Sequence, residues 1–151
     1  MNDRLRPLSR FLLGLSKEYV AGVLFGTQTD TDDITGRTMS EQPVTCLSPE
    51  LVRTALGRFT GEIEQVPPAY SALKQDGQPL YRLARRGQEI RPKSRKVMVY
   101  ELELLGWEPP TATIRCRVSA GTYVRALARD LGTSLGTVAT LASLVRTKVG
   151  Q

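Results

Sequence analysis

One segment constrains the fold more strongly than any other part of the chain. Residues 17–26 read KEYVAGVLFG, and an extended chain with this sequence presents apolar side chains on both of its faces. Strands that are apolar on both faces occur inside sheets that are covered on both sides. The segment therefore predicts a central strand of such a sheet.

Apolar residues at helical spacing predict helices before and after this strand. The best marked one begins at Ser48-Pro49-Glu50, which supplies a hydroxyl cap, a first-turn proline and an acidic side chain in order. Another follows Gly121-Thr122, which provide a turn and a cap, and extends from Tyr123 to about Leu135. Further helices are expected over residues 3–15, over 79–86, and as a short element between Gly136 and Leu144.

Alternation of apolar and polar residues predicts two more strands. They cover residues 96–105 and 112–118, and the turn at 107–110 joins them as an antiparallel hairpin. The first of them is expected to present one apolar face made of Met98, Tyr100, Leu102 and Leu104.

Two segments lack a regular pattern. The polar residues 27–37 are interpreted as a loop, and residues 61–74, interrupted by two prolines, as irregular. Together the elements predict an α+β fold with a mixed, largely antiparallel sheet flanked by helices, in one domain over residues 1–151.

Composition removes several classes of chemistry. The 151 residues contain no histidine, which excludes nucleophiles activated by imidazole and histidine-ligated metals. Cys46 and Cys116 are far apart and are interpreted as reduced thiols, which favours the cytoplasm. No apolar run reaches the roughly 18 residues that a membrane span needs. A net charge of +6, from 21 basic and 15 acidic residues, favours a polyanionic partner such as nucleic acid.

The segment Ser119 to Arg125 is the densest candidate site. It leaves a strand through Gly121 and places the phenol of Tyr123 and the guanidinium of Arg125 two positions apart at the start of a helix. Backbone N–H groups and the positive end of the helix dipole favour an anion there, and Arg125 could hold it with two hydrogen bonds. The alternative interpretation makes Tyr123 a core residue and Arg125 a member of a surface ion pair.

Two charged clusters have both a functional and a structural interpretation. Asp30, Asp32 and Asp33 suggest a cation loop, but the remaining ligands of a calcium-binding pattern are missing, so a structural turn is favoured. A basic stretch would either follow a phosphate backbone or cover a solvated helix face and loop. It consists of Arg82, Arg85, Arg86, Arg91, Lys93, Arg95 and Lys96.

Five further motifs occur in order along the chain. They are KEYV (17–20), GTQTDTD (26–32), PPAYSALK (67–74), GTYVR (121–125) and LASLVRTKVG (141–150). In this order they resemble successive blocks of the bacterial TruB-type tRNA pseudouridine synthases. The resemblance spans nearly the whole chain, and five ordered blocks are far more specific than one.

This resemblance implies an enzyme that isomerises a uridine in the T-loop of tRNA to pseudouridine without a metal or cofactor, with the T-arm of tRNA as its partner. The family flips the target base, detaches it, rotates it and rejoins it through carbon, which agrees with the need to unstack a base before acting on it. By motif match, Tyr19 is implied to be a catalytic residue that stacks on the uridine and offers its hydroxyl for a polar contact or proton transfer. Tyr123 is implied to contact the base or its ribose, and Leu144 to line the apolar wall. Arg125 is implied to form an ion pair with the catalytic carboxylate.

The chain departs from the family's pattern mainly in lacking a counterpart of the family's catalytic Asp. That Asp lies in a G-H-x-G-T-L-D-P block before the Lys-x-Tyr strand, and residues 1–16 contain nothing similar. A C-terminal RNA-binding domain of the PUA type is also missing. We therefore expect a partial, N-terminally truncated catalytic domain that is inactive alone. The alternatives are a non-catalytic tRNA-binding module and a fragment of a gene with a misassigned start.

A missing catalytic block has two expected physical consequences. An unpaired buried charge is costly, so Arg125 is expected to turn to solvent or to capture an anion. A sheet without its N-terminal strands exposes an unpaired edge and apolar surface, which favours self-association through that edge. The expected partner is thus tRNA, with self-association as a further contact and no membrane.

Overall fold

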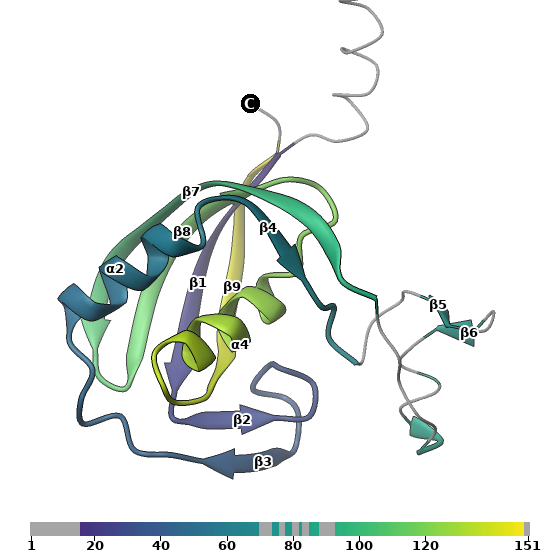
Figure 1. The fold of residues 1–151 in the computed structure, drawn as a ribbon, viewed down its shortest axis with the longest axis horizontal. Helices are drawn as coiled ribbons and strands as arrows, with labels where there is room; N and C mark the ends of the chain where they lie inside the picture. Colours follow the sequence, from purple (N-terminus) through teal and green to yellow (C-terminus); the bar gives the residue numbers. More distant parts are fainter. Residues whose placement is uncertain are drawn as a thin grey trace, which may run out of the picture.

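A five-stranded antiparallel sheet forms the body of the molecule (Figure 1). The computed structural model describes residues 16–69 and 93–149, together with residues 74, 75, 78, 79, 82 and 85–87 between them. In spatial order the strands are β4 (Gly61–Gln65), β7 (Arg95–Glu108), β8 (Thr111–Val118), β1 (Lys17–Phe25) and β9 (Ala139–Val149). With the helices described below, the chain has an α+β fold.

Strand β1 lies between two other strands, which confirms its predicted interior position. It pairs with β8 from Lys17 opposite Val118 to Leu24 opposite Thr111, and with β9 on its other side. Its last residue, Phe25, is buried and meets the Trp107 ring edge to face, with ring centroids 6.0 Å apart. Strand β4, which carries a residue of the candidate site, is separated from β1 by β7 and β8, whereas β9 pairs with β1 directly.

Two helices, α2 (Pro49–Arg58) and α4 (Val124–Ser134), cover one face of the sheet (Figure 1). They confirm two of the predicted helices. Their apolar residues fill the space above the sheet, and full burial of a Leu or Val side chain stabilises a fold by about 2 kcal/mol. The buried positions include Val52, Ala55 and Leu56 of α2 and Val124, Leu127 and Leu131 of α4.

The opposite face of the sheet is charged in the described part of the chain. Arg115 on β8 donates hydrogen bonds to the carboxylates of Glu18 (2.8 Å), Glu101 (2.9 Å) and Glu103 (3.0 Å). These bonds raise the pKa of Arg115 further above its ordinary value. A sheet covered on both faces is therefore a wrong prediction for the described residues. The apolar pattern of β1 alone does not reveal the charged residues that its neighbours place on the same face.

The β7–β8 hairpin confirms the predicted antiparallel pair, with Leu102 opposite Cys116. Its register shifts between Val99 and Glu101. Val99 is consequently buried, whereas Tyr100 is exposed and does not share the core face of Leu102. The predicted single apolar face is wrong at this point because a β-bulge shifts the alternation by one residue.

Several short strands occur where no strand is predicted. Strand β2 (Thr27–Thr29) pairs with β3 (Thr38–Glu41) in the segment interpreted partly as a loop. Strand β4 occupies the start of the segment interpreted as irregular and pairs with β7. These strands carry Thr and Glu side chains rather than an apolar alternation, because one side of each is exposed. Their pairing partners, and not their own residues, make them strands.

Strand β9 replaces the short helix predicted between Gly136 and Leu144. Gly132 allows a very close approach, because a Cβ atom at this position would lie 2.6 Å from the Ala139 nitrogen. Gly136 has φ +80°, a conformation that favours glycine, so the chain reverses directly after α4 and enters the sheet. Pairing with β1, which is remote in the sequence, outweighs a weak local preference for helix.

Two predicted helices cannot be compared in full. The helix over residues 3–15 lies outside the described residues, and so does most of the helix over 79–86, where the Arg86 N–H donates to the Arg82 carbonyl (3.2 Å). Nearby, β5 (Lys74–Gln75) pairs with β6 (Gln78–Pro79). Among the described residues, no helix is long and apolar enough to cross a membrane.

Both cysteines are free thiols, as predicted. Cys46 is exposed in the connection between β3 and α2, and Cys116 is buried on β8. Burial raises the pKa of the Cys116 thiol to about 11, so this group stays protonated at neutral pH.

Candidate functional site

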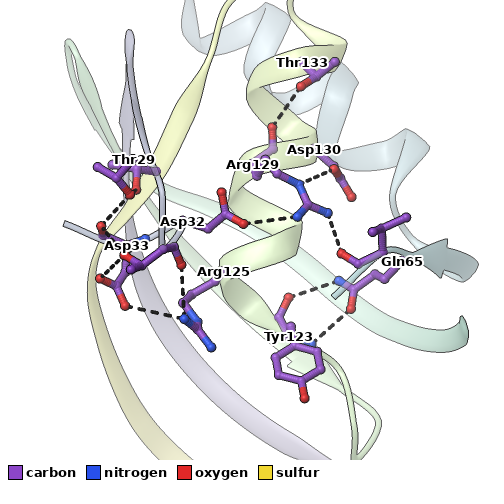
Figure 2. Close-up of polar contacts among 12 residues, drawn as sticks. Thr29, Asp32, Asp33, Gln65, Tyr123, Arg125, Arg129, Asp130 and Thr133 are labelled. Atoms are coloured by element: carbon purple, nitrogen blue, oxygen red, sulfur yellow. Dashed lines mark hydrogen bonds and ion pairs between the residues drawn. The ribbon is translucent and has the colours of Figure 1, made fainter. Parts of the chain in front are cut away.

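The first turn of α4 is held by a residue of β4. Tyr123 is the N-cap residue, and its side chain makes no capping hydrogen bond. Instead the buried amide of Gln65 accepts from the Tyr123 N–H (3.0 Å) and donates to the Tyr123 carbonyl (3.1 Å), as Figure 2 shows. The predicted cap at Thr122 is therefore wrong, and the Thr122 hydroxyl lies 3.1 Å from the Ser119 hydroxyl.

Arg125 extends from the first turn of α4 toward the loop after β2 (Figure 2). Its Nη1 atom donates to the Thr31 carbonyl (3.1 Å) and lies 3.9 Å from a carboxylate oxygen of Asp33. About a quarter of each side chain is exposed, 24% for Arg125 and 28% for Asp33. The expectation that Arg125 turns to solvent or captures an anion is wrong, because this chain supplies a carboxylate. The alternative interpretation, a partly exposed ion pair, describes Arg125 correctly.

Asp33 is kept ionised by its own loop. Burial raises its pKa, but hydrogen bonds from Thr35 and Thr31 and the charge of Arg125 lower it, and the net shift is downward. Asp30 accepts from the Arg37 N–H (2.8 Å) at the other end of the same turn. These bonds confirm the structural turn. No group of three His, Cys, Asp or Glu side chains in the described residues could hold a metal ion.

Arg129, one turn further along α4 than Arg125, joins three segments (Figure 2). Its guanidinium donates to Asp32 (3.1 Å), to Asp130 (3.0 Å) and to the Val66 carbonyl (2.6 Å). Asp32 is buried and has φ +65°. Burial raises the pKa of Asp32, and the charge and hydrogen bond of Arg129 oppose this shift without cancelling it. Arg129 therefore fixes the loop that presents Asp33 to Arg125.

Tyr19 and Leu144 lie on neighbouring strands, on the face that the helices cover. Tyr19 is opposite Cys116, and Leu144 is opposite Ala21. Directly opposite residues of an antiparallel pair share a face, and both Cys116 and Ala21 belong to the core. Tyr19 is half-buried against this core, and Leu144 is 43% exposed.

Helix α4 packs against β9 on the same face. The four residues that the sequence singles out thus come from β1, β9 and the first turn of α4, on one side of one sheet. Their roles toward a base remain predictions.

The basic stretch lies on the surface where it is described. Arg95 approaches the candidate site, because its Nη2 atom lies 3.3 Å from the position of a Cβ atom on Gly121. Gly121 has φ +86° and directly precedes the α4 cap, so a second guanidinium stands beside the start of α4. The exposed members are Arg82, Arg85, Arg86, Lys93, Arg95 and Lys96, and Arg91 lies outside the described residues.

Comparison with protein families defines the class of this chain. Residues 4–124 match the family model described as TruB family pseudouridylate synthase (N terminal domain). This match covers most of the chain, which therefore belongs to the TruB family of pseudouridylate synthases.

The curated relatives share one name, tRNA pseudouridine synthase B. The chain is 43% identical over 148 residues to the protein of Francisella tularensis subsp. novicida (strain U112), covering 97% of this chain and 49% of that relative. It is 47% identical over 142 residues to the protein of Azoarcus sp. (strain BH72), covering 94% and 47%. For Pseudomonas paraeruginosa (strain DSM 24068 / PA7) the identity is 48% over 142 residues, covering 94% and 46%. The chain spans about half the length of the curated relatives it matches.

Solved structures share the fold. A chain in a crystal structure of a Cbf5-Nop10-Gar1 complex superposes with a TM-score of 0.61 at 28% identity, covering 89% of this chain and 30% of that chain. A chain in the structure of an H/ACA RNP bound to a substrate RNA containing 2'-deoxyuridine gives a TM-score of 0.60 at 24% identity, covering 95% and 31%. The second likeness shows the fold alone.

Sequence reasoning missed three residues of the site. Gln65 and Arg129 carry no local motif, because their partners lie 58 and 97 positions away in the sequence. Asp33 was considered only for a cation loop or a turn. One sequence signal points to Asp33, because it directly follows the GTQTDTD motif. This motif and the GTYVR motif, which contains Arg125, both resemble blocks of the same family.

Proposed function

We propose that this chain forms one wall of a uridine pocket in a tRNA pseudouridine synthase, with the T-arm of tRNA as substrate. The observation that carries the proposal is the single sheet face on which Tyr19, Leu144 and the first turn of α4 lie. Membership of the TruB family and the name of the curated relatives support it. A tRNA substrate would also place the chain in the cytoplasm.

Each side chain suits a separate part of this task. The phenol of Tyr19 offers a flat face on which a flipped pyrimidine stacks, and a hydroxyl for a polar contact. Leu144 supplies an apolar wall, and Tyr123 contacts the base or its ribose. Arg125 already shares its guanidinium between Asp33 and Thr31. A guanidinium has five donors, so Arg125 could pair with the family's catalytic carboxylate as well.

The reaction needs a carboxylate that the resemblance places in the G-H-x-G-T-L-D-P block. The 151 residues contain no such block. We therefore expect no turnover by this chain alone, and turnover when a segment with the block is fused to its N-terminus. The role of the chain in such a fusion is to bind the everted uridine and to hold the attacking carboxylate ionised through Arg125.

An incubation with a T-arm RNA hairpin, followed by detection of pseudouridine, tests this proposal. Pseudouridine is expected with the fused protein only, and changing the Asp of the block to Asn should abolish it. Turnover by the chain alone would show that another residue supplies the carboxylate. A folded fusion that binds the hairpin without forming pseudouridine would overturn the enzymatic assignment.

A second candidate function is a non-catalytic module that binds the tRNA elbow. The net charge of +6 and the exposed arginines that follow β6 favour it. This candidate predicts an affinity for the hairpin that falls steeply with added salt. It also predicts little loss of affinity in Tyr123→Phe and no preference for a hairpin with an intact target uridine.

We also propose that the outer edge of β9 supports self-association. Among the described strands, β9 pairs with β1 alone. Main-chain bonds from Leu141 to Asp32 (3.1 Å) and from Ile34 to Leu141 (2.9 Å) cover the start of this edge. Beyond it, Leu144 and Val145 are 43% and 60% exposed. Unpaired edges of this kind tend to pair with other strands.

Sedimentation velocity at increasing protein concentration tests the edge. A dimer is expected at high concentration, and Val145→Lys should shift the chain to monomer because a charged edge residue disfavours strand pairing. Exposed Met39→Lys on β3 serves as the matched control. A monomer at every concentration would contradict this part of the proposal.

A further inference from the structure

We infer that Gln65 is a positioning residue of the candidate site, acting through the main chain of Tyr123. The inference rests on the proposed function, because it concerns the placement of a side chain that the proposal assigns to the uridine. Gln65 is the last residue of β4, and its side chain is 1% exposed. Both of its described hydrogen bonds go to Tyr123, and neither goes to Tyr19 on β1 or to Leu144 on β9.

The geometry of the contact is that of a two-point clamp. The Gln65 amide satisfies both the N–H and the carbonyl of one residue, Tyr123, at 3.0 and 3.1 Å. The same carbonyl also accepts from the Leu127 N–H (3.1 Å) as the first bond of α4. A buried amide that loses either partner leaves an unsatisfied polar group, so the two bonds restrict Tyr123 to one placement. The direction of its Cα–Cβ bond, from which the phenol extends, is fixed with it.

A second attachment lies one residue further along the chain. The Val66 carbonyl accepts from Arg129 (2.6 Å), so consecutive residues of this segment contact the cap and the second turn of α4. Pro67 and Pro68, which follow, are both buried. Figure 2 shows Gln65 and Arg129 on the same side of α4, with Tyr123 at its start. The end of β4 and the first two turns of α4 therefore behave as one rigid unit that presents Tyr123.

Binding of two RNA hairpins measures this role. The probes are a T-arm hairpin with uridine at the target position and the same hairpin with an abasic site there. Stacking on one aromatic side chain is expected to give the uridine hairpin a Kd between about five- and a hundredfold lower for the wild-type chain. Gln65→Met keeps the length of the side chain and removes both bonds. It should lower this ratio severalfold, to a value still set by stacking on Tyr19, while the abasic hairpin binds as before. Ser48→Ala, which removes a bond at the start of α2, is the matched control and should leave the ratio unchanged.

The variant Gln65→Glu tests the clamp a second way, because a change of pH switches the two hydrogen bonds to Tyr123 on or off in one and the same protein. A protonated carboxyl group can accept from the Tyr123 N–H and donate to its carbonyl, whereas an ionised one faces that carbonyl with like charge. Burial raises the pKa of such a carboxyl group, so it takes up a proton at a higher pH than an exposed glutamate does. The ratio of the two Kd values should be lower than that of the wild type at pH 8 and recover at pH 5, whereas the wild-type ratio should be the same at both.

Fluorine NMR of the chain labelled with 3-fluorotyrosine gives a readout without RNA. The Tyr123 signal, assigned through Tyr123→Phe, should move in Gln65→Met, and the Tyr100 signal should not. An unmoved Tyr123 signal, or a Gln65→Met ratio equal to that of the wild type, would overturn the inference. If the wild-type chain fails to distinguish the hairpins, the proposed function fails instead, and the NMR shift still decides the positioning role. If Gln65→Met does not fold, the pH series of Gln65→Glu decides it.

Discussion

The two helices on the covered face begin in different ways. Helix α2 is capped from within its own turn, because Ser48 accepts from the Leu51 N–H (3.2 Å) and Pro49 opens the helix. Helix α4 has no side-chain cap of its own. Gln65 from β4 binds the main chain of Tyr123 at its start, and Arg129 in its second turn donates to the Val66 carbonyl directly after β4. The start of α2 is thus encoded locally, and the start of α4 is encoded by the tertiary structure.

This difference matches the difference in what the two helix starts do. A local cap makes a helix begin, wherever the helix then packs. A clamp from another strand makes the helix begin in a defined position relative to that strand. The start of α4 carries Tyr123 and Arg125, whose placement relative to β1 and β9 matters for the proposed pocket. The start of α2 carries no predicted site residue.

The largest effect is expected when Arg129, the residue that joins the most segments, is removed. Arg129→Met leaves the buried carboxylate of Asp32 without its partner, which should lower the free energy of unfolding by about 3 kcal/mol at neutral pH. Urea unfolding measures the loss. Because burial raises the pKa of Asp32, the loss should shrink as the pH falls through this raised pKa and Asp32 takes up a proton.

The control for this prediction is the double variant Arg129→Met, Asp32→Asn. A neutral amide needs no charged partner, so this protein should recover part of the loss. Equal stability of the single and double variants would show that the ion pair is not the source of the effect.

A smaller effect is expected for Gln65→Met. It leaves the buried N–H of Tyr123 without an acceptor, and such a group costs about 2 kcal/mol. Differential scanning calorimetry together with urea unfolding measures this cost. A variant as stable as the wild type would indicate that water replaces the amide and that α4 does not depend on β4.

Ser48→Ala should cost less, about 1 kcal/mol, because only one local bond is lost at an exposed helix end. Unfolding in urea measures it under the same conditions as for Gln65→Met. If the local cap proved more costly than the Gln65 clamp, the proposed contrast between the two helix starts would be reversed.

The smallest effect is expected for Asp33→Asn, and it concerns how the free energy of unfolding changes at acid pH. The pKa of Asp33 in the folded chain lies below its ordinary value of 3.8, so its ionised form stabilises the fold above about pH 4. This contribution, about 0.5 kcal/mol for a partly exposed pair, is lost as the pH falls through the lowered pKa. Asp33→Asn should therefore be less stable than the wild type at pH 6, and the difference should vanish near pH 2. A difference that is independent of pH would exclude this ion pair as its cause.

The sequence predicts those parts of the fold whose determinants are local. Helix α2, the strand β1 and the β7–β8 hairpin follow from apolar spacing and from the Ser48-Pro49 cap. Strands β9 and β4 do not, because they become strands through partners that are remote in the sequence. Strand β2 does not either, because its residues, Thr-Gln-Thr, show no apolar alternation and it pairs with the nearby β3. The charged second face of the sheet escapes prediction for the same reason.

The residues of the candidate site also fall into two groups, those that local sequence motifs predict and those that they do not. Tyr19, Tyr123, Arg125 and Leu144 were identified from motifs, and the structure brings them to one face. The supporting residues Gln65 and Arg129 have no motif, since each acts on a residue far away in the sequence. The sequence predicts no partner for Arg125, because the G-H-x-G-T-L-D-P block is absent. In the structure the carboxylate of Asp33, in the turn after β2, takes that place.

The unequal environments of the two cysteines have a practical consequence. Cys46 is exposed, whereas Cys116 is buried with its pKa raised to about 11, so a thiol-directed dye or spin label at neutral pH should react with Cys46 alone. The natural polypeptide thus carries a single attachment point for a reporter group, and distances from it to a labelled RNA can be followed without changing any residue.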